Sequence, residues 1–494
     1  MKKLFNTFFI LGFVGVFCVA CNQHNKKSDL IFSLSKDGTY YSVRAKDEVL
    51  FKETVEIIIP EEYKGLPVKK IENFGFANRK MGAVKLSNNI EEIGEYAFSH
   101  DINLKKVEFG KKLKIIGSNA FECCFNLDGN ICFPESLESI NKQSFYLCEN
   151  VNSYYLDRNV SYIGESTFVT GSAHFSINVS EENKNYKVID GTLFTKDEKT
   201  LILYNHNREE LDYSIPNTVE TVSENAFSYS NIQFVNIPDS VIKLGASVFQ
   251  WCTNLNKVTF SKNLNEISEY AFVGCQKLNN IDIPGNISII REGAFMGCRG
   301  LLNIRLNDGL KIIEEYALHD AKLSEIPASV EIIENYAFAW SLSSKVVNIP
   351  TSLTRLGYNF MDSHILEINV VNGNENYHSK NGMLYNTFNN ELMICPRGKK
   401  GEIEVENGTE YIYTNAFHDC SYITSISIPN SIRTISIDAF ELCYNLEQIY
   451  YAGSIREWVD SFNNFYGGII RIHCSDGEII HPMTERPPIP GECG

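Results

Sequence analysis

Residues 278–298 read LNNIDIPGNISIIREGAFMGC, and this pattern recurs along most of the chain. Ile281–Ile283 alternates apolar and polar residues, which is the period of a half-buried β-strand. Pro284 follows directly, and proline suits the residue at which a ladder ends and the chain turns, because it has no N–H to donate. A second short apolar pair comes next, and Ala294–Phe295 closes the stretch. We interpret it as one coil of a repeat whose apolar side chains face inward.

The repeat is most visible as an Ala-Phe pair or a close variant, and most neighbouring pairs are 22 to 24 residues apart. One unit of this size cannot bury its apolar side alone, whereas stacked units bury it as layers of a continuous core. We therefore predict a solenoid of about fourteen coils. The second residues of the pairs are Phe76, Phe98, Phe121, Phe145, Phe168, Phe227, Phe249, Phe272, Phe295, Leu318, Phe338, Phe360, Phe417 and Phe440.

The pattern resembles the BspA-like leucine-rich repeats of bacterial surface proteins. Their units read Leu-x-x-Ile-x-Ile-Pro and then Val-x-x-Ile-Gly-x-x-Ala-Phe-x-x-Cys; Leu278–Pro284 matches the first half and Ile90–Phe98 the second. The resemblance covers roughly residues 55–451 and implies a leucine-rich-repeat solenoid of the β-rich α/β horseshoe type. It departs at Leu318, which replaces Phe, and at Leu323–Pro327, where the strand is two residues short. We expect a local kink there.

The regular spacing is interrupted twice by inserts that resemble each other. Each contains a dipeptide, Asp190–Gly191 or Asn381–Gly382. Such dipeptides favour tight β-hairpins, because both central residues of the turn need positive φ. We predict β-hairpin inserts near 177–213 and 369–408, as small meanders that either extend the sheet or project from it. They are either duplicated structural elements or projections that contact a ligand.

The first twenty residues combine a positive start with an apolar stretch too short for a confident membrane span. Small residues then precede Cys21, which resembles the lipobox of bacterial lipoproteins, although Cys18 stands where that family usually has Leu. The resemblance implies a removed signal peptide (1–20) and a tether (21–30) lipidated at Cys21. The alternative is an ordinary secretory signal cleaved near Ala20. Both interpretations export the protein.

The remaining boundaries follow from the extent of the repeat. We predict an N-terminal cap with the first strands over 31–75, the solenoid over 76–451 and a C-terminal cap over 452–481. Caps are expected because an end coil would otherwise expose its apolar layer. The Pro-rich tail, 482–494, is expected to be disordered.

Fourteen cysteines would normally suggest disulfides in an exported protein. Seven of them, however, stand three residues after the repeat Phe, and a fixed position in the repeat predicts a ladder of buried free thiols. Whether Cys474 and Cys493 pair is left open. The seven cysteines of the predicted ladder are Cys124, Cys148, Cys252, Cys275, Cys298, Cys420 and Cys443.

Charge and motifs narrow the function classes. The net charge of −16, without clustered Lys and Arg after the leader, argues against nucleic acid as a partner. Outside the leader the sequence contains no Cys-x-x-Cys pair with metal-ligand spacing, and it has no Gly-rich phosphate loop and no nucleophile motif. We therefore predict a protein that is not an enzyme, with no catalytic residues, no metal site and no cofactor.

The solvent-facing strand positions of successive coils should lie side by side, about 4.8 Å apart. This row is either a soluble face without a particular role or the binding surface. In the second case we predict Tyr155, Phe234 and Arg305 as its anchors, because aromatic and Arg residues dominate binding hot spots.

Together these features predict a membrane-anchored, non-catalytic recognition protein of the cell envelope, at the outer membrane or cell surface. Its expected partner is a surface protein or glycan of a host or neighbouring cell, and we expect a monomer. A role in adhesion is what the resemblance implies. One alternative is a structural or assembly scaffold inside the envelope, which Lys26 and Lys27 slightly favour because they are basic. The other alternative is an enzyme without a recognisable motif.

Overall fold

The structure is a computed structural model. The predicted signal peptide, Cys21, Phe360, Cys493 and the predicted tail lie outside the residues that it describes. Among the described residues, no helix is both long and apolar enough to cross a membrane. The described residues are 29–47, 50–51, 56–171, 175–206, 208–323, 325–339, 341, 344–357, 365–462, 465 and 467–481.

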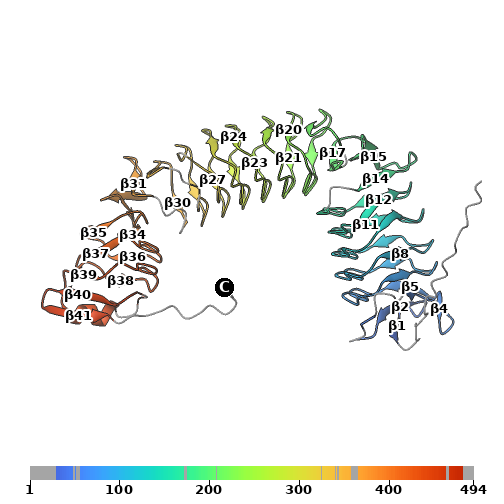
Figure 1. Ribbon diagram of the computed structural model, residues 1–494, viewed down its shortest axis with the longest axis horizontal. Helices are drawn as coiled ribbons and strands as arrows, with labels where there is room; N and C mark the ends of the chain where they lie inside the picture. Colours follow the sequence, from blue (N-terminus) through green and yellow to red (C-terminus); the bar gives the residue numbers. More distant parts are fainter. Residues whose placement is uncertain are drawn as a thin grey trace, which may run out of the picture. The chain divides into compact units, whose positions relative to one another are not determined.

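The chain divides into two compact units, of residues 1–129 with 134–150 and of residues 130–133 with 151–494 (Figure 1). In each unit a coil contributes two strands, and these pair in parallel with their counterparts in the next coil. We call the ladder of apolar–polar–apolar strands, such as β24 (Asn280–Ile283), the first ladder. The ladder of short strands before Ala-Phe, such as β25 (Ile289–Ile290), is the second ladder.

In the first unit, the second ladder begins with a hairpin in which β1 and β2 are antiparallel, and β2 then pairs in parallel with β5. Its strands are β1 (Leu30–Leu34), β2 (Tyr41–Ala45), β5 (Leu66–Ile71) with antiparallel β4 (Glu62–Tyr63), β7 (Glu92–Ile93), β9 (Ile115–Ile116) and β11 (Ser139–Ile140). The first ladder consists of β3 (Glu56–Ile58), β6 (Ala83–Lys85) and β8 (Lys106–Glu108).

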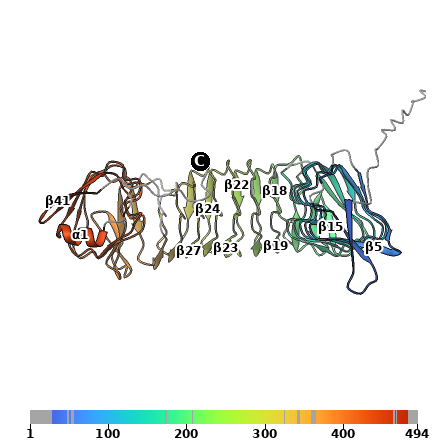
Figure 2. The same ribbon diagram turned by 90° about the horizontal axis from the view of Figure 1, so that it is seen from below.

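In the second unit, the two ladders lie along opposite edges of the stack. Figure 2 shows β18, β22 and β24 on one edge and β19, β23 and β27 on the other. The first ladder falls into five sheets, and its last strand, β41, is antiparallel to β40. The sheets are β10 (Gly129–Cys132), β12 (Val151–Leu156) and β14 (Ser176–Val179); β18 (Asp212–Ser214), β20 (Phe234–Asn236) and β22 (Lys257–Thr259); β24 and β26 (Asn303–Leu306); β29 (Val346–Ile349) and β31 (Glu367–Val370); and β35 (Gly401–Glu404), β37 (Ile423–Ile428), β39 (Gln448–Tyr451), β40 (Ile470–Cys474) and β41 (Gly477–His481).

The second ladder of this unit consists of β13 (Tyr162–Ile163), β17 (Thr200–Leu203), β19 (Thr221–Val222), β21 (Lys243–Leu244), β23 (Glu266–Ile267), β25, β27 (Ile312–Ile313), β28 (Ile332–Ile333), β30 (Arg355–Leu356), β34 (Glu391–Ile394), β36 (Tyr411–Ile412) and β38 (Thr434–Ile435). Within the described residues the one α-helix is α1 (Ile455–Phe462), which buries Trp458 and Phe462. The predicted leucine-rich-repeat solenoid is confirmed. Its turns number about 18 rather than fourteen, because strands before the first Phe, in the inserts and after the last Phe also stack.

Both inserts extend the ladders. In the first, β15 (Tyr186–Ile189), β16 (Thr192–Thr195) and β17 form an antiparallel meander, and β17 then pairs in parallel with β19. The second repeats this arrangement with β32 (Tyr377–Lys380), β33 (Met383–Asn386) and β34. The predicted turns are confirmed, with φ of 48° and 78° at Asp190 and Gly191 and of 51° and 68° at Asn381 and Gly382.

The repeat Phe side chains form the centre of the core. Ring centroids of Phe249 and Phe272 are 5.2 Å apart, and those of Phe272 and Phe295 are 5.1 Å apart. In the first unit, Phe98 and Phe121 stack at 5.1 Å. Such pairs contribute about 0.5–1.5 kcal/mol each beyond the burial of their area. The stack of rings therefore fills the interior from one coil to the next.

The repeat cysteines line the same core, and the predicted ladder of buried free thiols is confirmed for all seven. The Cys275 Sγ donates to the Phe249 carbonyl at 3.2 Å, and the Cys298 Sγ donates to the Phe272 carbonyl at 3.0 Å. Burial raises the pKa of the Cys252 and Cys298 thiols to about 12. Because the thiolate is the reactive form, these cysteines are structural donors rather than nucleophiles.

The coil after β26 is shorter than its neighbours, since Leu318 and Phe338 are only 20 residues apart. The strands β27 and β28 still pair, so the second ladder continues. The missing residues come from the first ladder, where the described residues of this coil form one isolated bridge, from Ile304 to Leu323. The strand that is two residues short at Leu323–Pro327 is thus reduced to this bridge, and the local kink expected there stays a prediction.

Candidate functional site

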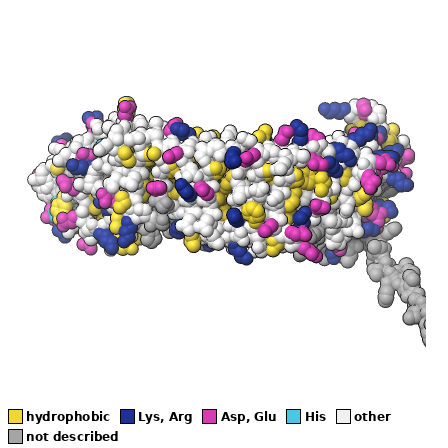
Figure 3. Space-filling view, turned by 90° about the horizontal axis from the view of Figure 1, so that it is seen from above, with side chains coloured by type: hydrophobic (Ala, Val, Ile, Leu, Met, Phe, Trp, Pro, Cys, Tyr) yellow, Lys and Arg dark blue, Asp and Glu magenta, His cyan; other side chains and the backbone are white. Residues whose placement is uncertain are grey.

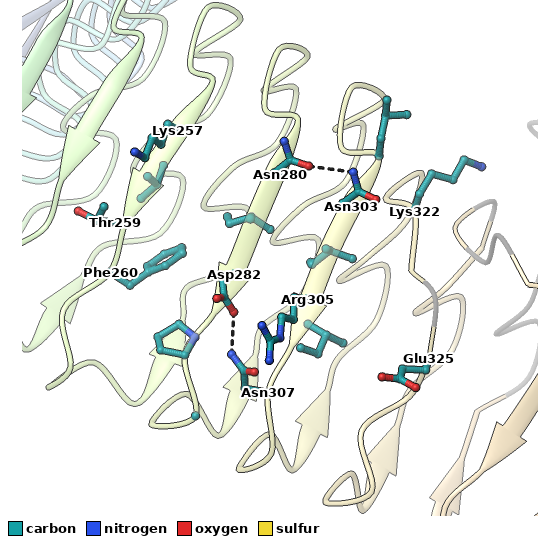
Figure 4. Close-up of a pocket in the computed structure, with 17 residues that line it drawn as sticks. Lys257, Thr259, Phe260, Asn280, Asp282, Asn303, Arg305, Asn307, Lys322 and Glu325 are labelled. Atoms are coloured by element: carbon teal, nitrogen blue, oxygen red, sulfur yellow. Dashed lines mark hydrogen bonds between the residues drawn. The ribbon is translucent and has the colours of Figure 1, made fainter.

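A groove of about 1000 Å³ opens on the solvent face of the first ladder in the second unit (Figure 4). Its floor is formed by β22, β24 and β26, and its sides include Phe260, Gly285 and the short coil at Lys322 and Glu325. The first ladder is interrupted here, because β22 ends one sheet and β24 with β26 forms a separate sheet. The groove therefore lies where regular strand pairing fails on both sides of β24 and β26.

Four side chains from successive coils form one edge of the groove, and we call them the upper row: Lys257, Asn280, Asn303 and Lys322 (Figure 4). Asn280 and Asn303 are register partners, and the Asn303 Nδ2 donates to the Asn280 Oδ1 at 2.8 Å. Lys322 comes next in the row. The parallel bridge between Ile304 and Leu323 places the residues before them, Asn303 and Lys322, next to each other. The upper row thus places two amides between two cations.

A second set of polar side chains lies below the upper row in Figure 4 and consists of Asp282, Arg305, Asn307 and Glu325. The Asn307 Nδ2 donates to the Asp282 Oδ1 and to the Ile283 carbonyl, both at 2.7 Å. The side chain of Arg305 makes no hydrogen bond or ion pair with any described residue, although its backbone belongs to the paired strand β26. Its guanidinium, which carries five N–H donors, is exposed to the groove.

The three predicted anchors are only partly brought together. Arg305 lies in the groove. Phe234 lies on β20, one coil outside the groove, next to Lys257 on β22. The Lys257 Nζ is 5.5 Å from the centroid of the Phe234 ring. Tyr155 is 38% exposed on β12 and does not line the groove.

Sequence reasoning did not identify the other members of the groove, Asn280, Asn303 and Lys322. The signal that could have found them was the 20-residue spacing between Leu318 and Phe338. That spacing shows that one coil lacks residues. Only the pairing of the second ladder shows that the first ladder loses them.

A smaller groove, of about 420 Å³, lies at the C-terminal end of the first ladder. Tyr450 stacks on His473 with ring centroids 4.7 Å apart, and the His473 Nδ1 is 3.5 Å from the Glu478 Oε1. A catalytic dyad needs a nucleophile within hydrogen-bond reach of its base. Ser427 and Cys474 line this groove, but no hydrogen bond joins either to His473 among the described residues.

The described residues contain no group of three or more His, Cys, Asp or Glu that could hold a metal ion. The face drawn in Figure 3 carries Lys, Arg, Asp and Glu side chains scattered among apolar ones. Such a mixed surface does not provide the clustered positive charge that phosphate binding requires.

A family model described as the BspA type leucine rich repeat region matches residues 69–199, 220–330, 320–396 and 397–469. No curated protein matches the chain. The solved structures that are similar to it include a leucine-rich repeat protein from Eubacterium ventriosum, with 22% identity and a TM-score of 0.46 over 67% of this chain and 94% of that chain. A leucine rich cell surface protein from Faecalibacterium prausnitzii has 20% identity and a TM-score of 0.37 over 89% and 97%. A leucine-rich repeat protein from Bacteroides ovatus has 17% identity and a TM-score of 0.41 over 90% and 98%.

Proposed function

The chain belongs to the BspA-type leucine-rich-repeat family, and from that premise we propose that it is a non-catalytic recognition protein. It binds a protein or glycan ligand on the solvent face of its first ladder, at the groove between β22 and the short coil. The observation that carries this proposal is Arg305, an exposed guanidinium in a concave polar site.

The groove suits binding because its polar groups are held by a rigid scaffold. The backbones of β24 and β26 pair over four residues each, from Asn280 with Asn303 to Ile283 with Leu306. Side chains on such strands are already placed before a ligand arrives, so less conformational entropy is lost on association. Ligand sites commonly combine apolar walls with a few placed polar groups, and Phe260, Leu302 and Arg305 supply that combination here.

We further propose that the protein is attached to the cell envelope by lipid at Cys21 and that it acts in adhesion at the outer membrane or cell surface. The support is the lipobox-like leader together with the family. A scaffold inside the envelope is the second candidate, which the basic Lys26 and Lys27 favour. Protease shaving of intact cells, with a periplasmic control protein, separates the two. Loss of the solenoid while the control survives supports surface exposure, and protection of both until the envelope is opened contradicts it.

The binding proposal is tested with the chain 22–494 on arrays of matrix proteins and glycans. We expect saturable binding that Arg305→Ala weakens by about tenfold or more, since a hot-spot side chain contributes roughly 2 kcal/mol. Arg299→Ala is the matched control, because Arg299 is 83% exposed outside the groove. Absence of binding across the arrays, or equal loss in both variants, would contradict the proposal.

A further inference from the structure

We propose that this groove binds an acidic polysaccharide whose sugar units run across the coils, roughly one unit per coil, with a carboxylate against Arg305. The inference rests on the proposed function and names the ligand class of the same site.

The first argument is charge. Three cations, Lys257, Arg305 and Lys322, and two anions, Asp282 and Glu325, line the groove, which gives a net charge of 3 − 2 = +1. The chain as a whole carries −16. One of the two anions, Asp282, already accepts a hydrogen bond from Asn307. The guanidinium fork of Arg305 matches a carboxylate in two parallel hydrogen bonds, so an anionic group is the complement of this site.

The second argument is spacing. Paired strands are about 4.8 Å apart, so the upper row repeats its polar groups at that interval over two steps, from Asn280 to Asn303 and on to Lys322. An extended peptide places side chains on one face only every ~6.6 Å, because successive side chains alternate. A peptide crossing the coils therefore loses register after one step. A linear chain of pyranose units advances by a step close to one coil and keeps its register along the row.

The third argument is the inventory of donors and acceptors in the upper row. The bond from the Asn303 Nδ2 to the Asn280 Oδ1 uses one donor and one acceptor. It leaves the Asn303 Oδ1 as an acceptor and the Asn280 Nδ2 as a donor. Adjacent acceptors and donors of this kind suit the hydroxyls of a sugar ring, which both donate and accept. Phe260 and Leu302, the latter 61% exposed, provide apolar surface for the C–H face of the ring.

The experiment measures binding of the chain 22–494 by calorimetry to three probes of matched length. They are an oligogalacturonate, a neutral (1→4)-linked glucose oligomer and poly-L-glutamate. We expect the oligogalacturonate to bind best, with an affinity that falls as salt is added, because exposed charges are screened. Arg305→Gln should weaken binding by about tenfold or more, and Lys257→Gln and Lys322→Gln by a few fold each.

Controls keep folding apart from binding. Lys262→Gln and Arg299→Gln remove cations outside the groove, 82% and 83% exposed, and should leave the affinity unchanged. Arg305→Lys keeps the charge without the bidentate fork, so it should bind between the native protein and Arg305→Gln. All variants should share the native melting temperature.

Equal or tighter binding of poly-L-glutamate overturns the inference in favour of an acidic peptide. Two other outcomes also overturn the inference but leave the proposed function standing. One is equal binding of the neutral oligomer, and the other is an array ligand that needs Arg305 but carries no acidic sugar. If none of these probes and no array ligand binds, both the inference and the proposed function fail.

Discussion

Two parts of the repeat contribute differently to the molecule: the regular coils from Phe249 to Phe295 and the short coil from Leu318 to Phe338. The former repeat every 23 residues and place a Phe and a thiol in every layer of the core. The latter has 20 residues, a Leu in place of Phe and one bridge in place of a first-ladder strand. Regular coils therefore supply stability, and the groove arises beside the coil that departs from the pattern.

The largest effect expected from this comparison is on the regular core. Phe272→Ala removes a buried ring between Phe249 and Phe295, and we expect the free energy of unfolding to fall by about 3–5 kcal/mol. Leu318→Ala in the short coil is the matched change and should cost about 2–3 kcal/mol, near the low end for a buried Leu. Denaturant unfolding measures both, and an equal or larger loss at Leu318 would contradict the ranking.

Acid should destabilise the first insert more than the regular coils. His206 is buried there against Phe175, and burial lowers its pKa from 6.5 to about 4. The unfolded chain therefore binds a proton between these pH values and the folded chain does not. We expect stability to be full above about pH 6.5 and to fall by about 3 kcal/mol as the pH drops to 4.

The readout is amide exchange in β17, near His206, and in β25, a strand from a stretch without histidine. Exchange rates are first divided by the intrinsic rate at each pH. On acidification the protection of β17 should then fall, and the protection of β25 should stay unchanged. His206→Phe, which keeps an aromatic ring, should abolish that difference. Parallel changes in both strands would argue against a local effect of His206.

Restoring the missing strand should remove the groove. Inserting two residues after Leu323 to restore the Leu-to-Ile spacing of the Leu-x-x-Ile-x-Ile pattern gives β26 a full partner, so amide exchange at Arg305 and Leu306 should slow by about tenfold. Ligand binding at the groove should weaken to a similar degree. An insertion of two residues in the turn at Asn263 is the control. Unchanged exchange in β26 would show that the short coil does not cause the interruption.

The smallest effect concerns the thiol position. Cys275→Ala loses the bond to the Phe249 carbonyl and should cost about 1 kcal/mol. Ala321 occupies the same position in the short coil and has no donor. Ala321→Cys should therefore be neutral or stabilising by up to about 1 kcal/mol. Thermal unfolding of both variants checks the pair, and a destabilised Ala321→Cys would show that this coil has no room for the thiol.

Much of the fold could be predicted because its determinants are local. The 22-to-24-residue spacing fixes the coil, alternation fixes which face of each strand is buried, and Asp190–Gly191 fixes its hairpin. The number of turns was wrong, because strands without a following Phe, such as β14 and β17, stack in the same ladders.

The candidate site was less predictable. Arg305 was identified as an exposed strand residue, and that placement holds. Asn280 and Asn303 were not, since isolated asparagines carry no signal until the register sets them side by side. Tyr155 was chosen for the same chemical reason as Phe234, yet only Phe234 lies next to a residue of the groove.

The sequence by itself determined the repeat, the buried faces of Phe and Cys and the position of the short coil, because each depends on side chains within one unit. Only the tertiary structure decided that the short coil keeps its strand in the second ladder and loses the one in the first. Strand pairing between coils is a contact between residues about one repeat apart, and its energy depends on both partners together. The groove is a property of that pairing, so it becomes visible only when the coils are stacked.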